Sequence, residues 1–311
     1  MQKASYSRIT QQLDFYPNAG PLVAHITGDA FILTAFLFTN HGKLYAVSQL
    51  LLPLLMFRAF ALMHDCVHGS ATKIKALGDG IGIVTGALCL LPYEPWKKIH
   101  LLHHKWTGNL DQDPSMGLIK QFPAFSRARV SILNFCWRHR LPGLAISQHF
   151  VFWAKSYKFV LTAESRAEKV KNALSILVPI LLYAVFSWTK NVPGLLLYLA
   201  MVEIINFPHH LQMPMLEGRN SFPVYEQHQT ARSCHYPRWF SRNALNNFNL
   251  HIEHHLFPRL PWYRLDTARD LVRAELQGEY TAGNDWMREN RQWPIEKVLA
   301  KNLTPPAEKA A

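Results

Sequence analysis

The sequence predicts an all-α membrane protein with four transmembrane helices in two hairpins, interfacial helices and a histidine-rich cap on the cytoplasmic side. Three observations lead to this fold class. The 311 residues contain four long apolar blocks, the blocks come in two pairs with short connections, and the histidine-rich motifs lie at or beyond the block ends. No internal repeat is visible, so we expect residues 1–311 to form a single domain.

The predicted spans are residues 22–38, 45–63, 170–188 and 193–210. An α-helix rises about 1.5 Å per residue, so a block of this length can cross the roughly 30 Å hydrocarbon core of a bilayer. The alternative is a large soluble protein with buried helices, but such helices rarely remain apolar over this length. Arg58 lies inside the second block, where its side chain either extends toward the membrane interface or pairs inside the helix bundle, and at this depth we expect the first.

The short connections set the expected topology. Residues 39–44 and 189–193 join the blocks of each pair, so each pair should form an antiparallel hairpin. Residues 64–169 and 211–311 then lie on one side of the membrane. The segment 64–169 contains 14 Lys+Arg against 7 Asp+Glu, so the positive-inside rule makes this side cytoplasmic. That orientation, together with anionic lipid headgroups, explains the net charge of +12, and no basic cluster lies on a nucleic-acid-binding motif.

Other segments and the cysteines allow further expectations. Residues 77–93 are apolar and glycine-rich, which suits a re-entrant or interfacial helix as well as a span. Residues 142–160 mix aromatic side chains with lysines, as an interfacial helix does. The tail at 303–311 should be disordered.

The four cysteines show no CxxC spacing and indicate free thiols in a reducing compartment. No cleavable signal peptide is evident, so the first span should act as its own anchor.

Half of the sixteen histidines fall in three short motifs, which we call the boxes. The sequence HDCVH contains His64 and His68, HLLHH contains His100, His103 and His104, and HIEHH contains His251, His254 and His255. On a helix, positions i, i+3 and i+4 share one face, with Cβ atoms about 5–6 Å apart. The first box begins where the second span ends, and the other two boxes lie on the same predicted side. All eight imidazoles can therefore meet at one place beneath the bilayer.

The number and type of ligands restrict the metal. Eight neutral nitrogen ligands exceed what one ion needs, so two ions are expected, and imidazole suits Zn, Cu, Fe and Ni. The chain has no complete HExxH motif and no complete zinc-deaminase motif. It also lacks the Glu-x-x-His motif of soluble di-iron bundles. A nitrogen-rich di-iron site in a membrane protein is the interpretation that remains.

The motifs HDCVHGS, HLLHHKWTGNLDQDP and NLHIEHHLFP, in this order, resemble those of the integral-membrane fatty acid desaturases. These belong to the three-histidine-box superfamily, which also includes hydroxylases and ketolases. The resemblance covers about residues 45–265 and is closest in motif style to the acyl-lipid methyl-end desaturases. The third box begins with His251 rather than glutamine, which argues against a front-end desaturase.

The resemblance implies a catalytic cap with two non-haem iron ions and O2 as co-substrate. It implies an enzyme that introduces a C=C bond into an acyl lipid or acyl thioester, with electrons from an external donor of the ferredoxin or cytochrome b5 type. The boxes alone do not separate a desaturase from a sister hydroxylase or ketolase acting on a lipid or carotenoid. A non-catalytic membrane metal-binding protein is a more distant alternative, because transporters place their ligands at mid-membrane rather than at one edge.

The end of the fourth span, NFPHH, supplies one more candidate ligand. The resemblance implies an additional histidine after this span, sometimes with an asparagine four residues earlier that acts through water. His210 and Asn206 have this spacing, so His210 is the expected ninth ligand and Asn206 the candidate for a water-mediated contact. His209 lies about 100° around the helix from His210 and should have a structural role.

Carboxylates within or just after the boxes are candidates for holding the ligand imidazoles. A metal-bound histidine usually donates its second N–H to a carboxylate or a carbonyl group. The candidates are Asp65, Asp111, Asp113 and Glu253. We expect no catalytic residue beyond the metal ligands, because the metal carries the difficult chemical step.

Overall fold

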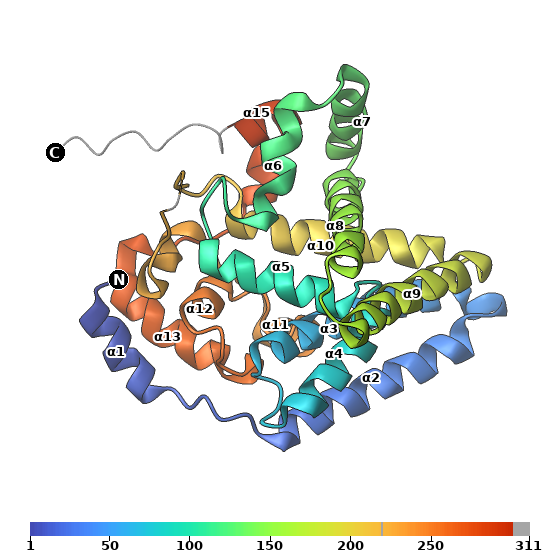
Figure 1. Cartoon of the computed structure of the whole chain (residues 1–311), viewed down its shortest axis with the longest axis horizontal. Coiled ribbons are helices and arrows are strands. Elements are labelled where there is room, and N and C mark those ends of the chain that lie inside the picture. Colours follow the sequence, from blue (N-terminus) through green and yellow to red (C-terminus); the bar gives the residue numbers. More distant parts are fainter. Residues whose placement is uncertain (219, 301–311) are drawn as a thin grey trace.

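The protein is described here by a computed structural model that covers residues 1–218 and 220–300, so the tail predicted to be disordered at 303–311 lies outside it. The described residues form α-helices, short 3-10 helices and two isolated β-bridges, and they include no strand (Figure 1). The predicted all-helical fold class is therefore confirmed.

Four long apolar helices dominate the structure: α2 (Ala19–Thr39), α3 (Tyr45–His68), α9 (Arg166–Trp188) and α10 (Val192–His210). Each contains one predicted span, and each is long and apolar enough to cross a membrane. The other α-helices are α1 (Lys3–Gln12), α4 (Lys75–Leu88), α5 (Tyr93–Trp106), α6 (Gly117–Gln121), α7 (Arg127–Arg138), α8 (Gly143–Leu161), α11 (Arg238–Ala244), α12 (His251–Leu256), α13 (Leu265–Leu276), α14 (Trp286–Asn290) and α15 (Ile295–Ala300).

Helix α3 extends five residues beyond the predicted end of its span and so includes the first box. Gly69 ends the helix with φ +68°, a left-handed conformation that glycine adopts without a steric penalty. Because the helix continues to this point, His64 and His68 occupy consecutive turns of one rigid element.

The glycine-rich segment around 77–93 forms a corner rather than a straight helix. Helices α4 and α5 meet at an angle of 102°. A Cβ atom on Gly82 would lie 2.2 Å from the Tyr93 ring, and one on Gly86 would lie 2.9 Å from the carbonyl oxygen of Leu91. The absence of a side chain at both positions therefore lets α4 pack along α3, while α5 turns away and carries the second box.

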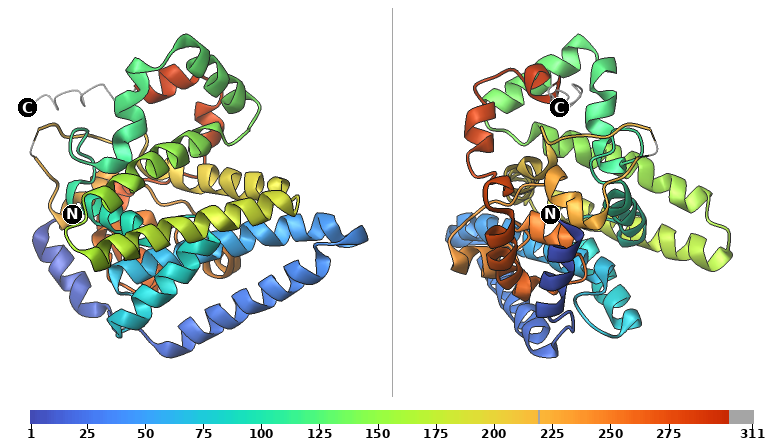
Figure 2. Two further views of the ribbon diagram at one scale, coloured as in Figure 1. Left: turned by 45° about the vertical axis from the view of Figure 1, so that its right-hand side comes forward. Right: turned by 90° about the vertical axis from the view of Figure 1, so that its left-hand side faces the viewer.

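Helix α3 lies at the centre and is buried along most of its length, whereas α2 and α9 are largely exposed. Helices α2, α4 and α10 pack on α3, and α9 packs on α8 and α4 (Figures 1 and 2). The exposed surface of the two outer helices carries large apolar side chains, among them Phe31, Phe38, Leu181 and Val185. Such a surface suits contact with lipid rather than with water.

The preferred prediction for Arg58, extension to the interface, is wrong, and the alternative of a pair inside the bundle is confirmed. Its guanidinium donates to the carboxylate of Asp29 on α2, to the carbonyl oxygen of Asn243 and, at 3.2 Å, to the carbonyl oxygen of His25. The arginine therefore pairs inside the helix bundle instead of extending to the interface. The physical reason is that an unpaired charge among apolar helices is costly, and Asp29 faces it directly.

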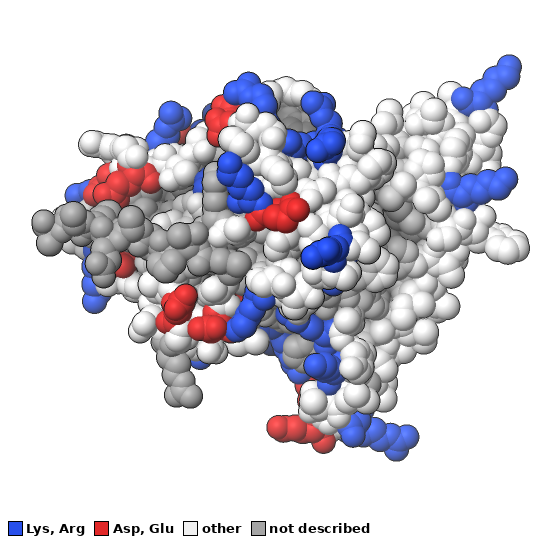
Figure 3. Space-filling model, turned by 90° about the horizontal axis from the view of Figure 1, so that it is seen from above, with Lys and Arg blue, Asp and Glu red and all other residues white. Residues whose placement is uncertain are grey.

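Charge is distributed unevenly over the surface. In the view from above, Lys, Arg, Asp and Glu side chains gather over the left and middle of the molecule (Figure 3). The right-hand part, towards which the long apolar helices extend in Figure 1, is almost free of charge except near its far end. An uncharged band of this kind is what a membrane-embedded surface requires.

Candidate metal centre

Four helix segments bring the candidate ligands together: the ends of α3 and α10, the last turns of α5, and the short helix α12. Helix α12 begins after two left-handed asparagines, Asn246 (φ 50°) and Asn247 (φ 53°). Asparagine tolerates this conformation better than most side chains. The buried Asn249 holds the same loop, since its amide donates to the carbonyl oxygen of Cys234 at 2.6 Å.

The histidines form two groups, within each of which the candidate ligand atoms lie within 4.8 Å of one another. The first cluster consists of His64, His68, His100, His104 and His254, and the second cluster of His103, His210, His251 and His255. All nine histidines predicted as ligands fall in these two clusters. Neighbours in the second and third boxes are divided between them, because adjacent helical residues point in different directions.

Three of the four rings in the second cluster are held from behind at Nδ1. The acceptors are the Asp113 carboxylate for His103 (2.9 Å), the Thr230 carbonyl oxygen for His210 (2.8 Å) and the Gln227 amide oxygen for His255 (3.3 Å). A neutral imidazole has a single N–H group, and each acceptor requires that it be on Nδ1. The three Nε2 atoms are therefore left with lone pairs.

These lone pairs point at one another. The Nε2 atom of His255 lies 3.3 Å from that of His103, 3.2 Å from that of His210 and 3.1 Å from that of His251. In the first two of these contacts neither nitrogen carries a proton, and such nitrogens repel one another unless a cation lies between them. The donor set of the second cluster therefore fits a metal ion.

The first cluster has the same close approach of ring nitrogens. The Nε2 atom of His100 lies 2.8 Å from that of His68 and 3.0 Å from that of His104. Burial, followed by the nearby imidazoles, holds the pKa values of His100, His104 and His254 well below their usual range. These rings are therefore neutral at pH 7, which is the state that binds metal.

The candidate carboxylates lie in different surroundings. Asp113 bonds to His103, as described above. An oxygen of Asp65 lies 3.6 Å from Nδ1 of His64, while its other oxygen accepts from the Trp262 backbone N–H at 3.2 Å. Asp65 is thus near a candidate ligand but beyond ordinary hydrogen-bond length.

The other two carboxylates are paired with groups other than histidine. Asp111 lies in an exposed turn, where it accepts from the Gly218 backbone N–H at 2.9 Å and pairs with Lys120 at 3.0 Å. Glu253 is buried and accepts from the hydroxyl groups of Ser233 and Tyr280, each at 2.6 Å. It lies two residues after His251, so the helix turns its side chain away from the face that carries the box histidines.

An apolar cavity of about 240 Å³ borders the two clusters. It is lined by side chains from α5, α8 and α10, including Trp96, Phe152, Leu199 and Phe207, and by His100, His103, His210 and His251. Asn206 also borders it, and the Oδ1 atom of Asn206 is buried without a hydrogen-bond partner among the described residues.

His209 belongs to neither cluster. Its ring stacks on that of His251, with centroids 4.1 Å apart and planes 12° apart. The sequence did not indicate this support of a candidate ligand, because the two residues are distant in the chain. The only signal in the sequence was the pair of adjacent histidines at the end of the fourth span.

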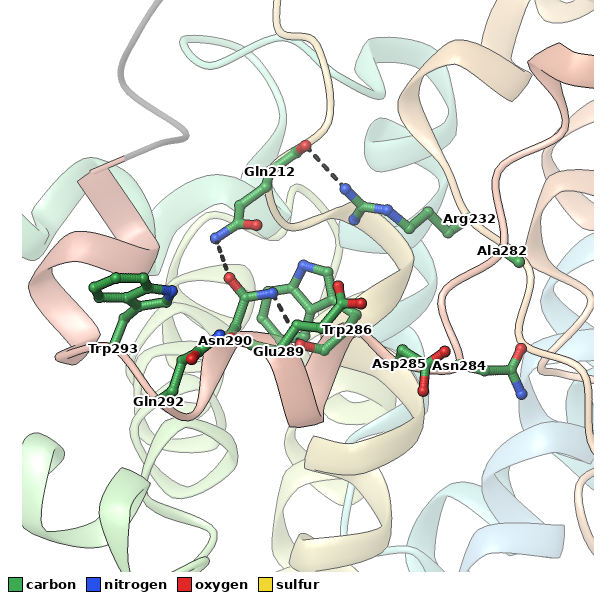
Figure 4. A pocket seen from close by; sticks show the side chains of 10 residues that line it. All are labelled: Gln212, Arg232, Ala282, Asn284, Asp285, Trp286, Glu289, Asn290, Gln292 and Trp293. Carbon is green, nitrogen blue, oxygen red and sulfur yellow. Dashed lines mark hydrogen bonds between the residues drawn. The ribbon is translucent and has the colours of Figure 1, made fainter.

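A second, polar pocket of about 540 Å³ lies behind the end of α10 (Figure 4). Arg232 donates to the carbonyl oxygens of Pro208 (3.0 Å), Leu211 and Gln212 (2.9 Å), while the Gln212 amide donates to Asn290 at 2.8 Å. No histidine is among the described residues that line this pocket. Arg232 fixes the end of α10 that carries His210, because a cation can satisfy the last carbonyl groups of a helix.

Comparison with known proteins gives a family match over most of the chain. The model of the family described as "Fatty acid desaturase" matches residues 43–283. The chain is 28% identical over 252 residues to "Omega-6 fatty acid desaturase, chloroplastic" of Arabidopsis thaliana, covering 77% of this chain and 54% of the relative.

Two bacterial relatives are similar at the same level. The chain is 25% identical over 261 residues to "sn-1 acyl-lipid omega-3 desaturase (ferredoxin)" of Synechocystis sp., covering 78% of this chain and 70% of the relative. It is 27% identical over 231 residues to "Fatty acid desaturase" of Bacillus subtilis, covering 68% and 64%. The chain spans little more than half the length of the Arabidopsis relative and of a similar omega-6 desaturase of Brassica napus.

Proposed function

The chain belongs to the fatty acid desaturase family, and from this premise we propose that it is a membrane-bound, O2-dependent desaturase that introduces a C=C bond into an acyl chain. The observation that carries the proposal is the position of the two histidine clusters at the wall of an apolar cavity. Such a cavity can hold an alkyl chain away from water and present one segment of it to the clusters.

We propose that the nine clustered histidines hold two iron ions, one ion in each cluster. When bound, the iron pair would supply the activation of O2 and the removal of hydrogen from the acyl chain. The protein would bind and orient the substrate. Trp96, which stacks on His100 with centroids 4.5 Å apart, fixes that ring and lines the cavity as well.

Polar groups around the second cluster would control protons and water. Asp113 holds a proton on Nδ1 of His103, which keeps Nε2 free for a metal. The unpartnered amide oxygen of Asn206 suits a hydrogen bond to a water molecule on the cavity side of His210. We therefore keep Asn206 as a water-mediated contact and His210 as the ninth ligand.

The placement in the membrane is also part of the proposal. The four long helices would cross the bilayer as two hairpins, with both clusters and the cap on the cytoplasmic side. Substrates would be acyl lipids or acyl thioesters. The name of the Synechocystis relative includes ferredoxin, which supports an external electron donor of the ferredoxin or cytochrome b5 type.

Lipid analysis tests this function. The chain is expressed in a host of known lipid profile, once with a ferredoxin and its reductase and once with a cytochrome b5 and its reductase. The acyl groups are compared with those from cells that carry His255→Ala. We expect new acyl groups lighter by two hydrogens only with the unaltered chain. New acyl groups that have gained oxygen would instead identify a hydroxylase or ketolase, and an unchanged profile under both donor systems would contradict the proposal.

A further inference from the structure

A fifty-residue stretch of the chain is basic and contains no acid. Residues 114–163 hold no Asp or Glu but seven basic residues: Lys120, Arg127, Arg129, Arg138, Arg140, Lys155 and Lys158. Within the part of the chain that the structure describes, only Lys120 of these seven forms an ion pair, with Asp111. Lys155 is partly buried, where it lines the cavity and donates to the carbonyl oxygen of Pro114 at 3.4 Å. The other five cations are exposed and available to an anionic partner, and four of them lie on or next to α7.

Helix α7 has two apolar faces instead of one. Leu133 and Trp137 are buried, and the Trp137 indole N–H donates to the carbonyl oxygen of Trp293 at 3.1 Å. On the opposite side, Ile132 is 64% exposed and Phe135 is 58% exposed. At about 100° per residue these two side chains form one stripe that points away from the buried face.

Arginines border this outer stripe on both sides. At about 100° per residue, Arg127 and Arg138 fall along one edge of the stripe and Arg129 along the other. All three are exposed. A narrow apolar stripe between arginines is the pattern of a helix that lies in a membrane interface, because the apolar groups enter the lipid while the guanidinium groups stay at the phosphates.

The position of α7 in the molecule agrees with this pattern. Helix α15 covers α7 on the side away from the far ends of the long helices, so the outer stripe faces the side towards which those helices run (Figures 1 and 2). Figures 1 and 3 share their left-to-right axis. At the left-to-right position of α7, the charged surface in Figure 3 gives way to the uncharged band. The stripe therefore lies where headgroups would meet the hydrocarbon.

We propose that α7 lies on the bilayer surface and binds anionic lipid headgroups, with Ile132 and Phe135 among the upper acyl chains and the three arginines on lipid phosphates. This inference rests on the membrane placement proposed above. Arginine suits this partner because its planar guanidinium can bond two phosphate oxygens at once. An acidic soluble protein could pair with the arginines but gives no reason for large apolar side chains between them.

The contact would also support the substrate cavity. Helix α7 leads directly into α8, whose inner face lines that cavity. The buried Glu203 of α10 fixes the start of α8 by accepting from the backbone N–H groups of Leu144 (3.1 Å) and Ala145 (3.2 Å). The cavity wall is thus held by α10 on one side and, through α7, by the lipid surface on the other.

Lipid selectivity measured by electron spin resonance tests the proposal without reference to catalysis. The full chain is reconstituted in phosphatidylcholine with traces of a spin-labelled lipid, either phosphatidylglycerol or phosphatidylcholine, and the immobilised fraction of each probe is compared. Each arginine near a phosphate favours an anionic lipid by roughly fivefold at the site it occupies. We expect the unaltered chain to prefer the anionic probe and the double variant Arg127→Gln/Arg138→Gln to lose most of that preference.

The matched control is Arg273→Gln/Arg288→Gln, which removes two exposed arginines from α13 and α14. It should keep the preference. Equal losses in the two double variants, or no preference in the unaltered chain, would overturn the proposal; the second result would leave an acidic protein as the partner of the arginines. Because desaturation is not measured, an unchanged acyl profile in the host would count against the proposed function only.

A second measurement applies even if the arginine variant fails to fold. A spin label is placed at Phe135→Cys in a Cys136→Ser background, and another at Arg273→Cys. We expect the label at 135 to be relaxed by O2, which concentrates in lipid, and the label at 273 by a water-soluble nickel complex. A label at 135 that is relaxed mainly by the nickel complex contradicts the membrane contact.

Discussion

The second cluster shows how single side chains set the protonation state of a candidate metal ligand. The rings of His103, His210 and His255 are each held at Nδ1 by an acceptor, so Nε2 must face the cluster without a proton. Only the acceptor of His103 is a carboxylate. A negative charge there makes the ring more basic and should strengthen metal binding more than a neutral acceptor does.

Replacing Asp113 with asparagine tests this role. The variant loses the charge and can orient an N–H group toward His103, so we expect metal affinity to fall by about 10–100-fold. Metal titration of the purified apo-protein measures the change. Asp111→Asn is the control, because Asp111 lies two residues away but pairs with Gly218 and Lys120. Similar losses in both variants would show that the contact with His103 is not the cause.

The adjacent pair His209 and His210 allows a second test. His210→Ala removes a predicted ligand and should release metal from the second cluster. His209→Phe should retain the metal, because a phenyl ring can keep the stacking on His251. Metal analysis of the two purified variants distinguishes them. If His209→Phe loses metal while His210→Ala retains it, the ligand assignment at the end of α10 is wrong.

At the scale of the element, corners and helix ends decide where the boxes lie. The end of α3 carries the first box as part of a rigid helix, and the corner between α4 and α5 aims the second box at it. Both features depend on glycine: Gly69 in a left-handed conformation and Gly82 under the ring of Tyr93.

Two glycines of α4 make a matched pair for the corner. A methyl group on Gly82 would overlap the ring of Tyr93, so Gly82→Ala should destabilise the protein by about 1–3 kcal/mol. Nothing lies within 4 Å of a Cβ atom on Gly80, so Gly80→Ala should stabilise the helix by about 0.5–1 kcal/mol. Thermal unfolding in detergent gives both values. A lower melting temperature for Gly80→Ala than for Gly82→Ala would contradict the packing described for the corner.

The pairing of α2 with α3 can be tested through Arg58. Arg58→Met would leave the Asp29 carboxylate with His25, at 2.9 Å, as its remaining partner, and the expected loss is about 3 kcal/mol. Arg8 pairs with Glu275 and is more exposed than Arg58, so Arg8→Met should lower the free energy of unfolding by at most about 1 kcal/mol. Unfolding of both variants in the same detergent makes the comparison. A loss for Arg58→Met no greater than that for Arg8→Met would imply that the buried pair does not hold the two helices together.

For the whole molecule, the sequence was informative where a signal is local and uninformative where it depends on contacts between distant segments. Apolar blocks identified the four long helices and histidine spacing identified eight of the nine clustered histidines, because both patterns follow from helix geometry. The ninth, His210, was expected from the resemblance to the desaturases. The division into two clusters was not predictable, since it depends on how α5, α10 and α12 cross. The pairing of Arg58 with Asp29 required the same long-range information.

The carboxylates illustrate the limit most clearly. Asp111 and Asp113 follow the second box at nearly equal distance, and only the fold turns one toward His103 and the other toward solvent. The orientation of Glu253 could have been predicted, because a residue two positions after His251 lies on the far side of the helix. Proximity in sequence was therefore a weaker guide to contact than position on the helix face.

We propose that each of the two histidine clusters holds one iron ion, and metal analysis of the purified, unaltered chain measures their number. This assignment predicts about two tightly held iron atoms per chain, because two complete sets of imidazole ligands converge separately. It also predicts that a second preparation, carrying His103→Ala and His255→Ala together, retains the ion of the first cluster. Exchangeable zinc or copper in place of iron, or loss of all metal from the double variant, would contradict it.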